Sequence, residues 1–258
     1  MKKLLAIIMA TALIATAFAG CGSENNTSEK ADTEKAVSKG TLVMGTNPAF
    51  PPYEFTDSNG KIVGIDAEIA QAIAEDMGYT LEIKDMEFDS LIAAVSSGSI
   101  DMVLAGMTVT EERKQSVNFS DSYAKGVQSI IVPENSKIKG PDDLKGKKIA
   151  VQAGTTGDIY CTDDFGQKNI SQYPNGAQAT AALVNGQVDA VVIDNEPAKQ
   201  FVAQNEGLKI LETAYAEEDY AIAIAKDNTE LLENVNKTIK SLKESGKLAE
   251  IVGKYIKA

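Results

Sequence analysis

Apolar residues in the first part of the chain recur with two different periods, which predict strands and helices in alternation. Short apolar runs predict strands at residues 41–45, 80–84 and 102–104. Between these runs lie two stripes with helical spacing, which predict a helix over 64–77 that ends at Gly78 and a second helix around 88–95. The stripe residues are Ile65, Ile69, Ile73 and Met77 in the first helix, and Phe88, Leu91, Ile92 and Val95 in the second. The β-α-β-α-β order indicates a parallel sheet with crossover helices.

The same alternation starts again beyond residue 125. The expected strands are 128–132, 148–152, 188–193, 208–211 and 220–225, and the expected helices are 176–184, 229–244 and 248–256, with a helical turn at 142–144. Two successive open α/β units predict two lobes. Open α/β sheets bind ligands where their strands end, so a ligand cleft is expected between the lobes.

The first 38 residues are expected to lie outside the fold. Two lysines precede an apolar run over 4–18 that is too short to span a membrane, which is the pattern of a secretory signal peptide at 1–20. The segment Phe18-Ala19-Gly20-Cys21 resembles a bacterial lipobox, which implies that Cys21 is acylated and begins the mature chain. Residues 22–38 are polar and cannot bury enough surface to offset their ordering entropy. We therefore expect residues 21–38 to be a lipidated cysteine and a disordered tether.

Composition narrows the function. The formal net charge is -12, from 37 acidic and 25 basic residues, and basic clusters are absent from the sequence. This argues against nucleic acid as a partner and against electrostatic attachment to a membrane, so the membrane contact is expected through the lipid alone. The chain has no His and two Cys, which argues against a Ser-His-Asp triad, most zinc sites and a disulfide framework. We expect no metal and no cofactor, and a buried core thiol at Cys161.

Three segments carry candidate binding chemistry. Residues 47–55 form a loop with three prolines and the aromatics Phe50, Tyr53 and Phe55, which suits either a small-molecule pocket or the core. Residues 102–113 form a strand that ends at Gly106, followed by an expected helix start at Thr110. Arg113 follows one turn later, where it either holds a carboxylate with help from Thr108 or pairs with Glu111 or Glu112 on a solvated face.

The third segment lies in the second unit. Residues 152–158 connect a strand to an expected helix start, whose amide groups favour an anion; the alternative is an ordinary glycine-rich connection. Asp194 follows the strand predicted at 188–193 and is either a ligand group or a helix N-cap.

These segments, together with Phe88-Asp89-Ser90-Leu91-Ile92 and Val117-Asn118-Phe119-Ser120, resemble the polar-amino-acid solute-binding proteins of bacterial ABC importers. The similarity extends from about Leu42 to the C-terminus, and the run over 105–113 is its most specific part. The resemblance implies a type II periplasmic-binding fold, in which each lobe is an open, mainly parallel sheet flanked by helices and two hinge strands join the lobes. The implied first lobe covers 39–125 and 219–258, and the second covers 126–218.

The resemblance also implies the roles of the site residues. Arg113, the Thr108 hydroxyl, backbone NH groups near Gly106 and Thr108, and Thr156 would hold the carboxylate of an amino acid, and Asp194 would accept from its ammonium group. Phe50 and Phe88 would flank the ligand side chain, with Asn47, Glu54 and Gln152 as polar lining. The family often carries Asp at the position of Asn47, and Glu54 remains as a carboxylate for a cationic side chain. The ligand is therefore expected to be a neutral polar or a basic L-amino acid.

The implied protein is a monomeric extracytoplasmic lipoprotein without enzymatic activity, which closes its lobes on the ligand and delivers it to an ABC permease. Two alternatives remain open. Some proteins of this fold resemble dehydratases that act on small carboxylates, and Asp194 or Glu54 would then serve as the general acid or base. A ligand sensor is the other alternative.

Overall fold

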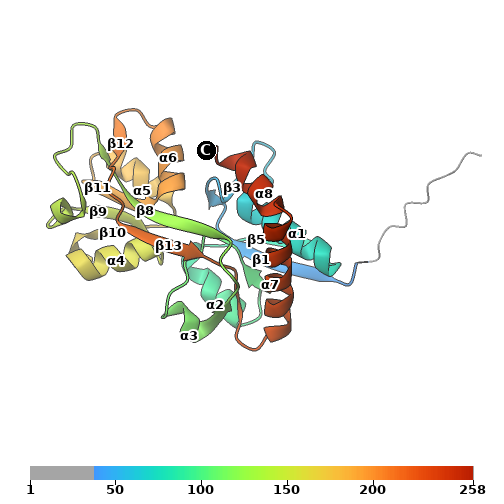
Figure 1. Ribbon diagram of the computed structural model, residues 1–258. Helices are drawn as coiled ribbons and strands as arrows, with labels where there is room; N and C mark the ends of the chain where they lie inside the picture. The colour runs from blue at the N-terminus through green and yellow to red at the C-terminus, as the bar shows by residue number, and fades with distance from the viewer. Residues whose placement is uncertain (1–37, 258) are drawn as a thin grey trace, which may run out of the picture. The chain divides into compact units, whose positions relative to one another are not determined.

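The computed structural model describes residues 38–257, and most of its strands form two mainly parallel sheets (Figure 1). The first sheet has the order β5-β1-β6-β14-β7, and β14 alone runs antiparallel to its neighbours. Its strands are β1 (Thr41–Thr46), β5 (Thr80–Asp85), β6 (Met102–Val103), β7 (Val117–Phe119) and β14 (Ala223–Ala225). The predicted signal peptide, the lipidated Cys21 and all of the predicted tether except Ser38 lie outside the described residues.

The second sheet has the order β10-β9-β11-β8-β12, and β13 also pairs with β8. Strands β9, β10 and β11 are parallel, whereas β8 is antiparallel to each of its partners. The strands are β8 (Ala124–Pro133), β9 (Ile149–Gln152), β10 (Ile170–Tyr173), β11 (Ala190–Asp194), β12 (Leu208–Ile210) and β13 (Ala216–Tyr220). The expected two-sheet α/β architecture is therefore confirmed.

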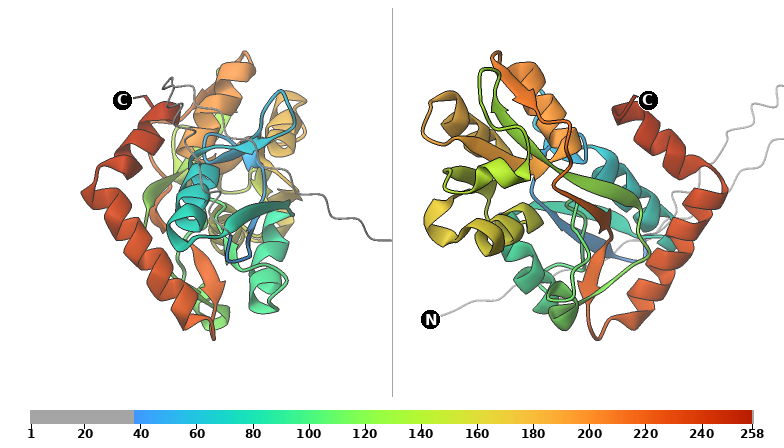
Figure 2. Two further views of the ribbon diagram at one scale, coloured as in Figure 1. Left: turned by 90° about the vertical axis from the view of Figure 1, so that its right-hand side faces the viewer. Right: turned by 60° about the vertical axis from the view of Figure 1, so that its left-hand side comes forward.

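Helices cover both sheets (Figures 1 and 2). We call the first sheet and the helices packed on it the first lobe, which contains α1 (Ile65–Met77), α2 (Leu91–Ser96), α3 (Arg113–Ser116), α7 (Thr229–Glu244) and α8 (Lys247–Tyr255). The second lobe contains the second sheet with α4 (Thr156–Phe165), α5 (Gly176–Val184) and α6 (Asn195–Gln204). A small sheet of β2 (Ala49–Phe50), β3 (Glu54–Thr56) and β4 (Ile62–Val63) belongs to the first lobe, and short 3-10 turns lie at Phe88–Ser90, Pro141–Leu144 and Gln167–Asn169. Within residues 38–257, no helix is long and apolar enough to cross a membrane.

Helix α1 shows how the sequence pattern produces packing. Ile65, Ile69 and Ile73 lie on one face and are fully buried, because residues four apart meet on the same side of a helix. Gly78 ends the helix with a φ of 78°, a left-handed conformation that glycine adopts without a steric penalty. Helices α7 and α8 pack on α1 and close this side of the first lobe (Figure 2).

Strands β8 and β13 carry the chain between the lobes. The chain leaves the first sheet through β8 and returns along β13, whose register places Glu218 opposite Gly126. The strand predicted at 220–225 is wrong as a single element, because β13 ends at Tyr220 in the second sheet and β14 begins at Ala223 in the first. The run at 220–225 contains only the last residue of β13 and all of β14, and the mostly polar residues 216–219 of β13 precede it. The exact lobe boundaries stay a prediction.

Polar surfaces hid other elements from the sequence analysis. Helix α6 has a low content of apolar residues, and β10 is a four-residue strand with an exposed Gln172. The helix expected to start at Thr110 begins instead at Arg113 and lasts four residues, although the Thr110 hydroxyl still accepts from the Arg113 amide at 3.1 Å. Periodicity fails for such short or polar segments because they show less than two turns of an apolar face.

Two matched substitutions test the burial of the second sheet. Val191→Ala removes two methyl groups from a fully buried position of β11 and is expected to lower the free energy of unfolding by about 2 kcal/mol. Val184→Ala makes the same change at a side chain that is 52% exposed and is expected to stay within about 0.5 kcal/mol of the wild type. Urea denaturation measures both values, and equal losses would contradict this packing.

Candidate ligand-binding site

A cleft between the two lobes collects most of the predicted site residues. From the first lobe it is lined by Phe50, Glu54, Phe88, Ala105, Gly106, Thr108 and Arg113, and from the second by Gln152, Thr155, Thr156 and Asp194. Asn47 is the one predicted site residue outside this lining, and it contacts the cleft through Gln152, whose Nε2 donates to Asn47 Oδ1 at 3.1 Å. Residues that lie up to 147 positions apart, Asn47 and Asp194, thus belong to one site.

Arg113 lies inside the cleft and not on a solvated face. It is 8% exposed, its Nη1 donates to the Thr108 carbonyl at 2.7 Å, and its Nη2 donates to the Gly154 carbonyl of the second lobe at 3.0 Å. The guanidinium lies 5.4 Å from the centre of the Phe88 ring, in cation–π contact. The alternative pairing of Arg113 with Glu111 is wrong, because Glu111 pairs with Lys114. Two of its five N–H donors are used by these carbonyl groups, which leaves donors for a carboxylate.

Gln128 connects the two halves of the site from the hinge strand β8. Its Nε2 lies 2.9 Å from both Asp194 Oδ2 and Glu218 Oε2, and 3.4 Å from the Thr156 hydroxyl. The Thr108 hydroxyl in turn donates to Glu218 Oε2 at 3.1 Å. A ligand carboxylate that accepts from Thr108 must therefore draw this hydroxyl away from Glu218.

Asp194 occupies the N-cap position of α6 without capping it. Its carboxylate accepts from no amide of the helix and instead accepts from Gln128 and from the Tyr220 hydroxyl. Burial raises the pKa of Asp194 to about 7, partly opposed by the bond from Tyr220. The alternative of an ordinary helix cap is therefore wrong, and the carboxylate is available to the cleft.

The loop before α4, at residues 153–155, is held by hydrogen bonds to its own polar groups and to Asp158. The Thr155 hydroxyl caps α4 by accepting from the Asp158 amide, and Asp158 Oδ2 accepts from the Gly154 amide at 3.0 Å. A side chain at Gly154 would meet Asp89 Cβ at 2.9 Å, so the backbone approaches the first lobe closely here. Thr156 lies in the first turn of α4 and is 2% exposed.

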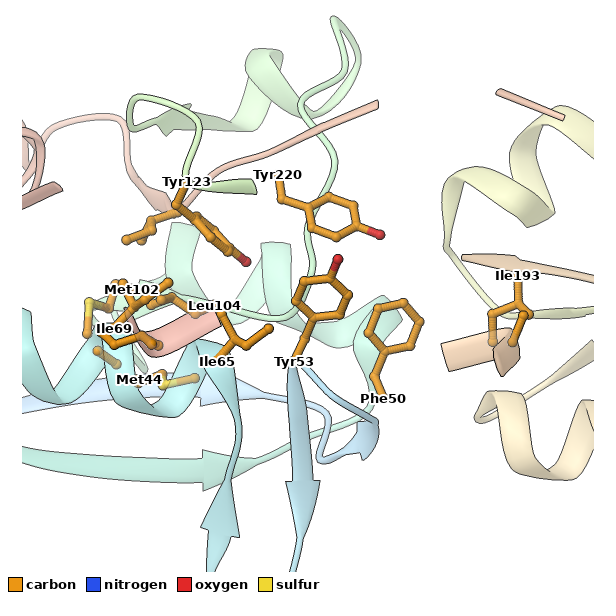
Figure 3. Packing of buried hydrophobic residues seen from close by; sticks show 14 of the residues in the cluster. Met44, Phe50, Tyr53, Ile65, Ile69, Met102, Leu104, Tyr123, Ile193 and Tyr220 are labelled. Carbon is orange, nitrogen blue, oxygen red and sulfur yellow. The ribbon is translucent and has the colours of Figure 1, made fainter. Parts of the chain in front are cut away.

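Phe50 forms the apolar wall of the cleft. Its ring stacks on Tyr53 at 5.9 Å, and a side chain at Gly106 would meet Phe50 Cε1 at 2.8 Å. Figure 3 shows Phe50 at the edge of the first lobe's core beside Tyr53, with Ile193 across from it. The aromatic loop therefore serves both core and cleft, with Tyr53 in the former and Phe50 in the latter. The Gly106 amide donates to Asp66 Oδ2 at 2.9 Å, so this NH group is already engaged inside the first lobe.

Sequence reasoning missed four polar residues around the cleft: Asp66, Gln128, Glu218 and Tyr220. Gln128 gave no clear signal, because it lies beside the polar Ser129 at the start of the apolar run of β8. Asp66 lies in the first turn of α1, where acidic side chains are favoured for reasons unrelated to a site, so its position carries no signal.

Charge is strongly unbalanced in this region. Among the described residues, the buried acidic side chains are Glu54, Asp66, Asp158, Asp194 and Glu218, whereas Arg113 is the one buried basic side chain. Burial lowers the pKa of Arg113, and the negative charges of Glu218 and Asp194 oppose this shift. Buried carboxylates need protons, hydrogen-bond donors or cations to offset their lost hydration.

Two lobes, two connecting strands and a polar cleft with an arginine on one side and a buried carboxylate on the other define a ligand-capturing protein of the two-lobed type. Residues 42–258 match the family of bacterial extracellular solute-binding proteins, family 3, and the chain belongs to this family. It is an extracytoplasmic solute-binding protein.

Relatives of known name agree with this assignment. The arginine-binding extracellular protein ArtP of Bacillus subtilis is 35% identical, over 99% of this chain and 98% of its own. An ancestral arginine-binding protein bound to glutamine is 43% identical with a TM-score of 0.81, over 86% of this chain and 100% of its own. The arginine-, lysine-, histidine-binding protein ArtJ of Geobacillus stearothermophilus is 38% identical with a TM-score of 0.80, over 84% of this chain and 96% of its own. These relatives are binding proteins, which confirms the expected class and gives no support to the dehydratase-like alternative.

The raised pKa of Asp194 predicts a measurable dependence of stability on pH. Its pKa of about 7 in the folded protein exceeds the ordinary 3.8, so between these values the unfolded chain releases the proton more readily and folding is penalised as pH rises. Asp194→Asn removes this penalty. The variant is expected to gain up to about 1.4 kcal/mol per pH unit over the wild type within that window. Urea denaturation from about pH 4 to about pH 7 measures the difference, with Asp227→Asn at an exposed position as the control. A constant difference would contradict the prediction.

Proposed function

We propose that this protein captures a basic L-amino acid, with arginine as the best fit, and delivers it to an ABC permease. The observation that carries the proposal is Glu54, which lines the cleft, is 1% exposed, and has no hydrogen-bond donor or cation on either oxygen within the described residues. A guanidinium group supplies both the charge and the paired donors that such a carboxylate lacks.

The α-carboxylate and α-ammonium groups, which all amino acids share, are held by residues of both lobes. Arg113, Thr108 and Thr156 bind the α-carboxylate, and Asp194 binds the α-ammonium group. Phe50 and Phe88 flank the side chain, Gln152 lines its path, and Asn47 holds Gln152 in place by accepting from its Nε2. Because these groups belong to both lobes, a bound zwitterion stabilises the closed arrangement in proportion to its differential affinity.

Relatives support this ligand class without agreeing on one ligand. All three are arginine-binding by name, but the ancestral protein is described with glutamine bound and ArtJ is also lysine- and histidine-binding by name. Glutamine shares the α-groups and offers a side-chain amide of shorter reach. The charge balance of the cleft favours arginine, because a neutral amide leaves the excess of buried carboxylates unchanged.

The protein acts beside the membrane as a monomer that is anchored through acylated Cys21. The N-terminal sequence supports this part of the proposal, because the apolar run ends in a lipobox-like Cys21 followed by a polar stretch. The tether at 22–38 keeps the binding lobes free to meet the permease, and closure on the ligand creates the surface that the permease recognises.

Calorimetric titration of the full chain in detergent, after removal of carried-over ligand by unfolding and refolding, tests the ligand. Arginine is expected to bind at least about tenfold more tightly than citrulline, because hydrogen bonds to a charged group exceed neutral ones by roughly 1.4 kcal/mol. Citrulline is the matched neutral analogue of nearly the same shape. Equal affinity for the two, or tighter binding of glutamine, would contradict a basic ligand.

Arg113→Ala tests the carboxylate site. Loss of one partner of a buried charge pair costs about 2–5 kcal/mol, so arginine affinity is expected to fall by about thirtyfold or more. Lys114→Ala at the next position removes an exposed cation that pairs with Glu111 and is expected to leave affinity unchanged. Equal effects of the two variants would rule out Arg113 as the carboxylate ligand.

Cys21→Ala tests the anchor. Without the acyl chains the protein lacks a membrane attachment, so the variant is expected to leave the pelleted membrane fraction of the producing bacterium. Fractionation followed by labelling with a fatty-acid analogue measures both attachment and acylation. Labelled protein in the variant would contradict acylation at Cys21.

A further inference from the structure

Glu54 and Asp66 are brought together by the backbone. The start of α1 docks on the loop that precedes β3, where the Asp66 amide donates to the Tyr53 carbonyl at 2.8 Å and the Ile65 amide donates to the Pro52 carbonyl at 3.2 Å. A side chain at Gly64 would meet the Tyr53 carbonyl oxygen at 2.2 Å, so this approach requires glycine. The docking fixes both carboxyl groups at the inner end of the cleft.

Among the described residues, hydrogen-bond donors reach only one of the four carboxyl oxygens of Glu54 and Asp66. Asp66 Oδ2 accepts from the Gly106 amide at 2.9 Å and from the Tyr123 hydroxyl at 2.8 Å. Asp66 Oδ1 and both Glu54 oxygens have no donor among the described residues, and all three atoms are buried. Two ionised carboxylates are acceptors only, so a hydrogen bond between Glu54 and Asp66 exists when one of them carries a proton.

The groups that face Glu54 are acidic or neutral. Beyond the effect of burial, the charge of Asp66 on α1 raises the pKa of Glu54 more than the charge of Asp194 at the end of β11 does. The hydroxyl groups of Tyr53 and Tyr123 complete the surroundings, and Figure 3 shows both rings at this edge of the core. Arg113 lines the same cleft, but its guanidinium faces Glu218 and Asp194 and is bonded to backbone carbonyls.

These surroundings favour one proton shared by the two carboxyl groups. Burial, and then the charge of Asp66, raise the pKa of Glu54 well above its ordinary range. Burial also raises the pKa of Asp66 to about 7, although the bonds from Gly106 and Tyr123 oppose the shift. Both shifts favour a pair that keeps one proton, so that one carboxyl group donates to the other and the pair carries one negative charge in place of two.

We propose that Glu54 and Asp66 share one proton, and that a cationic ligand side chain expels this proton to solvent when it binds beside Glu54. The inference rests on the proposed function, because the cation is the side chain of the bound amino acid. The exchange conserves charge locally: the ligand brings one positive charge and one proton leaves. Glu54 is thus the specificity-determining residue of the cleft, and Asp66 is a positioning residue that shares the proton with it.

The exchange makes selectivity depend on pH. A neutral ligand side chain leaves the proton in place, and a cationic one competes with it. Arginine affinity should therefore rise more steeply with pH than citrulline affinity, by up to about tenfold per pH unit for one proton. Asp194 releases its own proton to solvent when the α-ammonium group of either ligand binds beside it, so the difference between arginine and citrulline isolates the Glu54 pair.

The experiment is calorimetric titration of the full chain at about pH 7 in phosphate and in Tris, whose ionisation enthalpies differ. The dependence of the measured enthalpy on the buffer gives the number of protons released. Arginine is expected to release about one proton more than citrulline. Equal release by the two ligands, with arginine still binding, would overturn the inference and leave the proposed function standing. Absence of arginine binding would overturn the ligand class.

Two variants test whether the extra proton comes from the pair of Glu54 and Asp66. Glu54→Gln keeps a donor toward Asp66 but has no titratable group, and it is expected to abolish both the extra proton and the preference for arginine over citrulline. Glu82→Gln changes an exposed carboxylate of β5 and should preserve both. Infrared difference spectroscopy of the ligand-free wild type and Glu54→Gln gives a readout independent of affinity. A protonated-carboxyl band present in the wild type and lost in the variant supports the shared proton, and its absence from the wild type overturns it.

Discussion

The antiparallel pairing of β8 with β13 carries both connections between the lobes and also supplies the polar centre of the site. Gln128 belongs to β8, and Glu218 and Tyr220 lie on one face of β13 because they are two residues apart. The register places Glu218 opposite Gly126, where a side chain would meet the Tyr220 ring at 2.4 Å. The absence of that side chain lets the ring lie across its partner strand and direct its hydroxyl to Asp194. The strands that connect the lobes therefore also position the polar groups of the candidate site.

The cleft concentrates carboxyl groups at the expense of stability. Each buried acid costs free energy unless a donor, a proton or a cation satisfies it, and one buried arginine does not balance the acids around it. A protein selected for stability alone would place apolar residues here. The arrangement agrees with the proposed basic ligand, whose positive charge would offset the excess of buried carboxyl groups.

The sequence was sufficient for the elements with a clear apolar period, and it failed where polarity or brevity concealed them. Helix α1 and helix α7 were predicted within one residue of their observed bounds because their buried faces span several turns. The division of residues 220–225 between two sheets depends on which strands lie beside them, and a run of apolar letters does not contain this information.

The site was predicted for residues that belong to recognisable loops, and missed for those that depend on tertiary neighbours. Arg113 and Asp194 each had a second, local interpretation that was excluded once their bonding partners were known. Gln128, Glu218 and Asp66 became members of the site through contacts over 28 to 110 residues of sequence. Long-range contacts of this kind follow from the fold and not from local pattern.

The contacts between the lobes are uncharged on at least one side. Gln152 donates to Asn47, and Arg113 donates to a backbone carbonyl, whereas none of the ion pairs among residues 38–257 joins the first sheet's lobe to α4, α5 or α6. Exposed ion pairs weaken as ionic strength rises, but hydrogen bonds to neutral groups are little screened. The hydrogen bonds that join the two lobes therefore depend on geometry more than on ionic strength, and the same contacts persist in dilute and in concentrated salt.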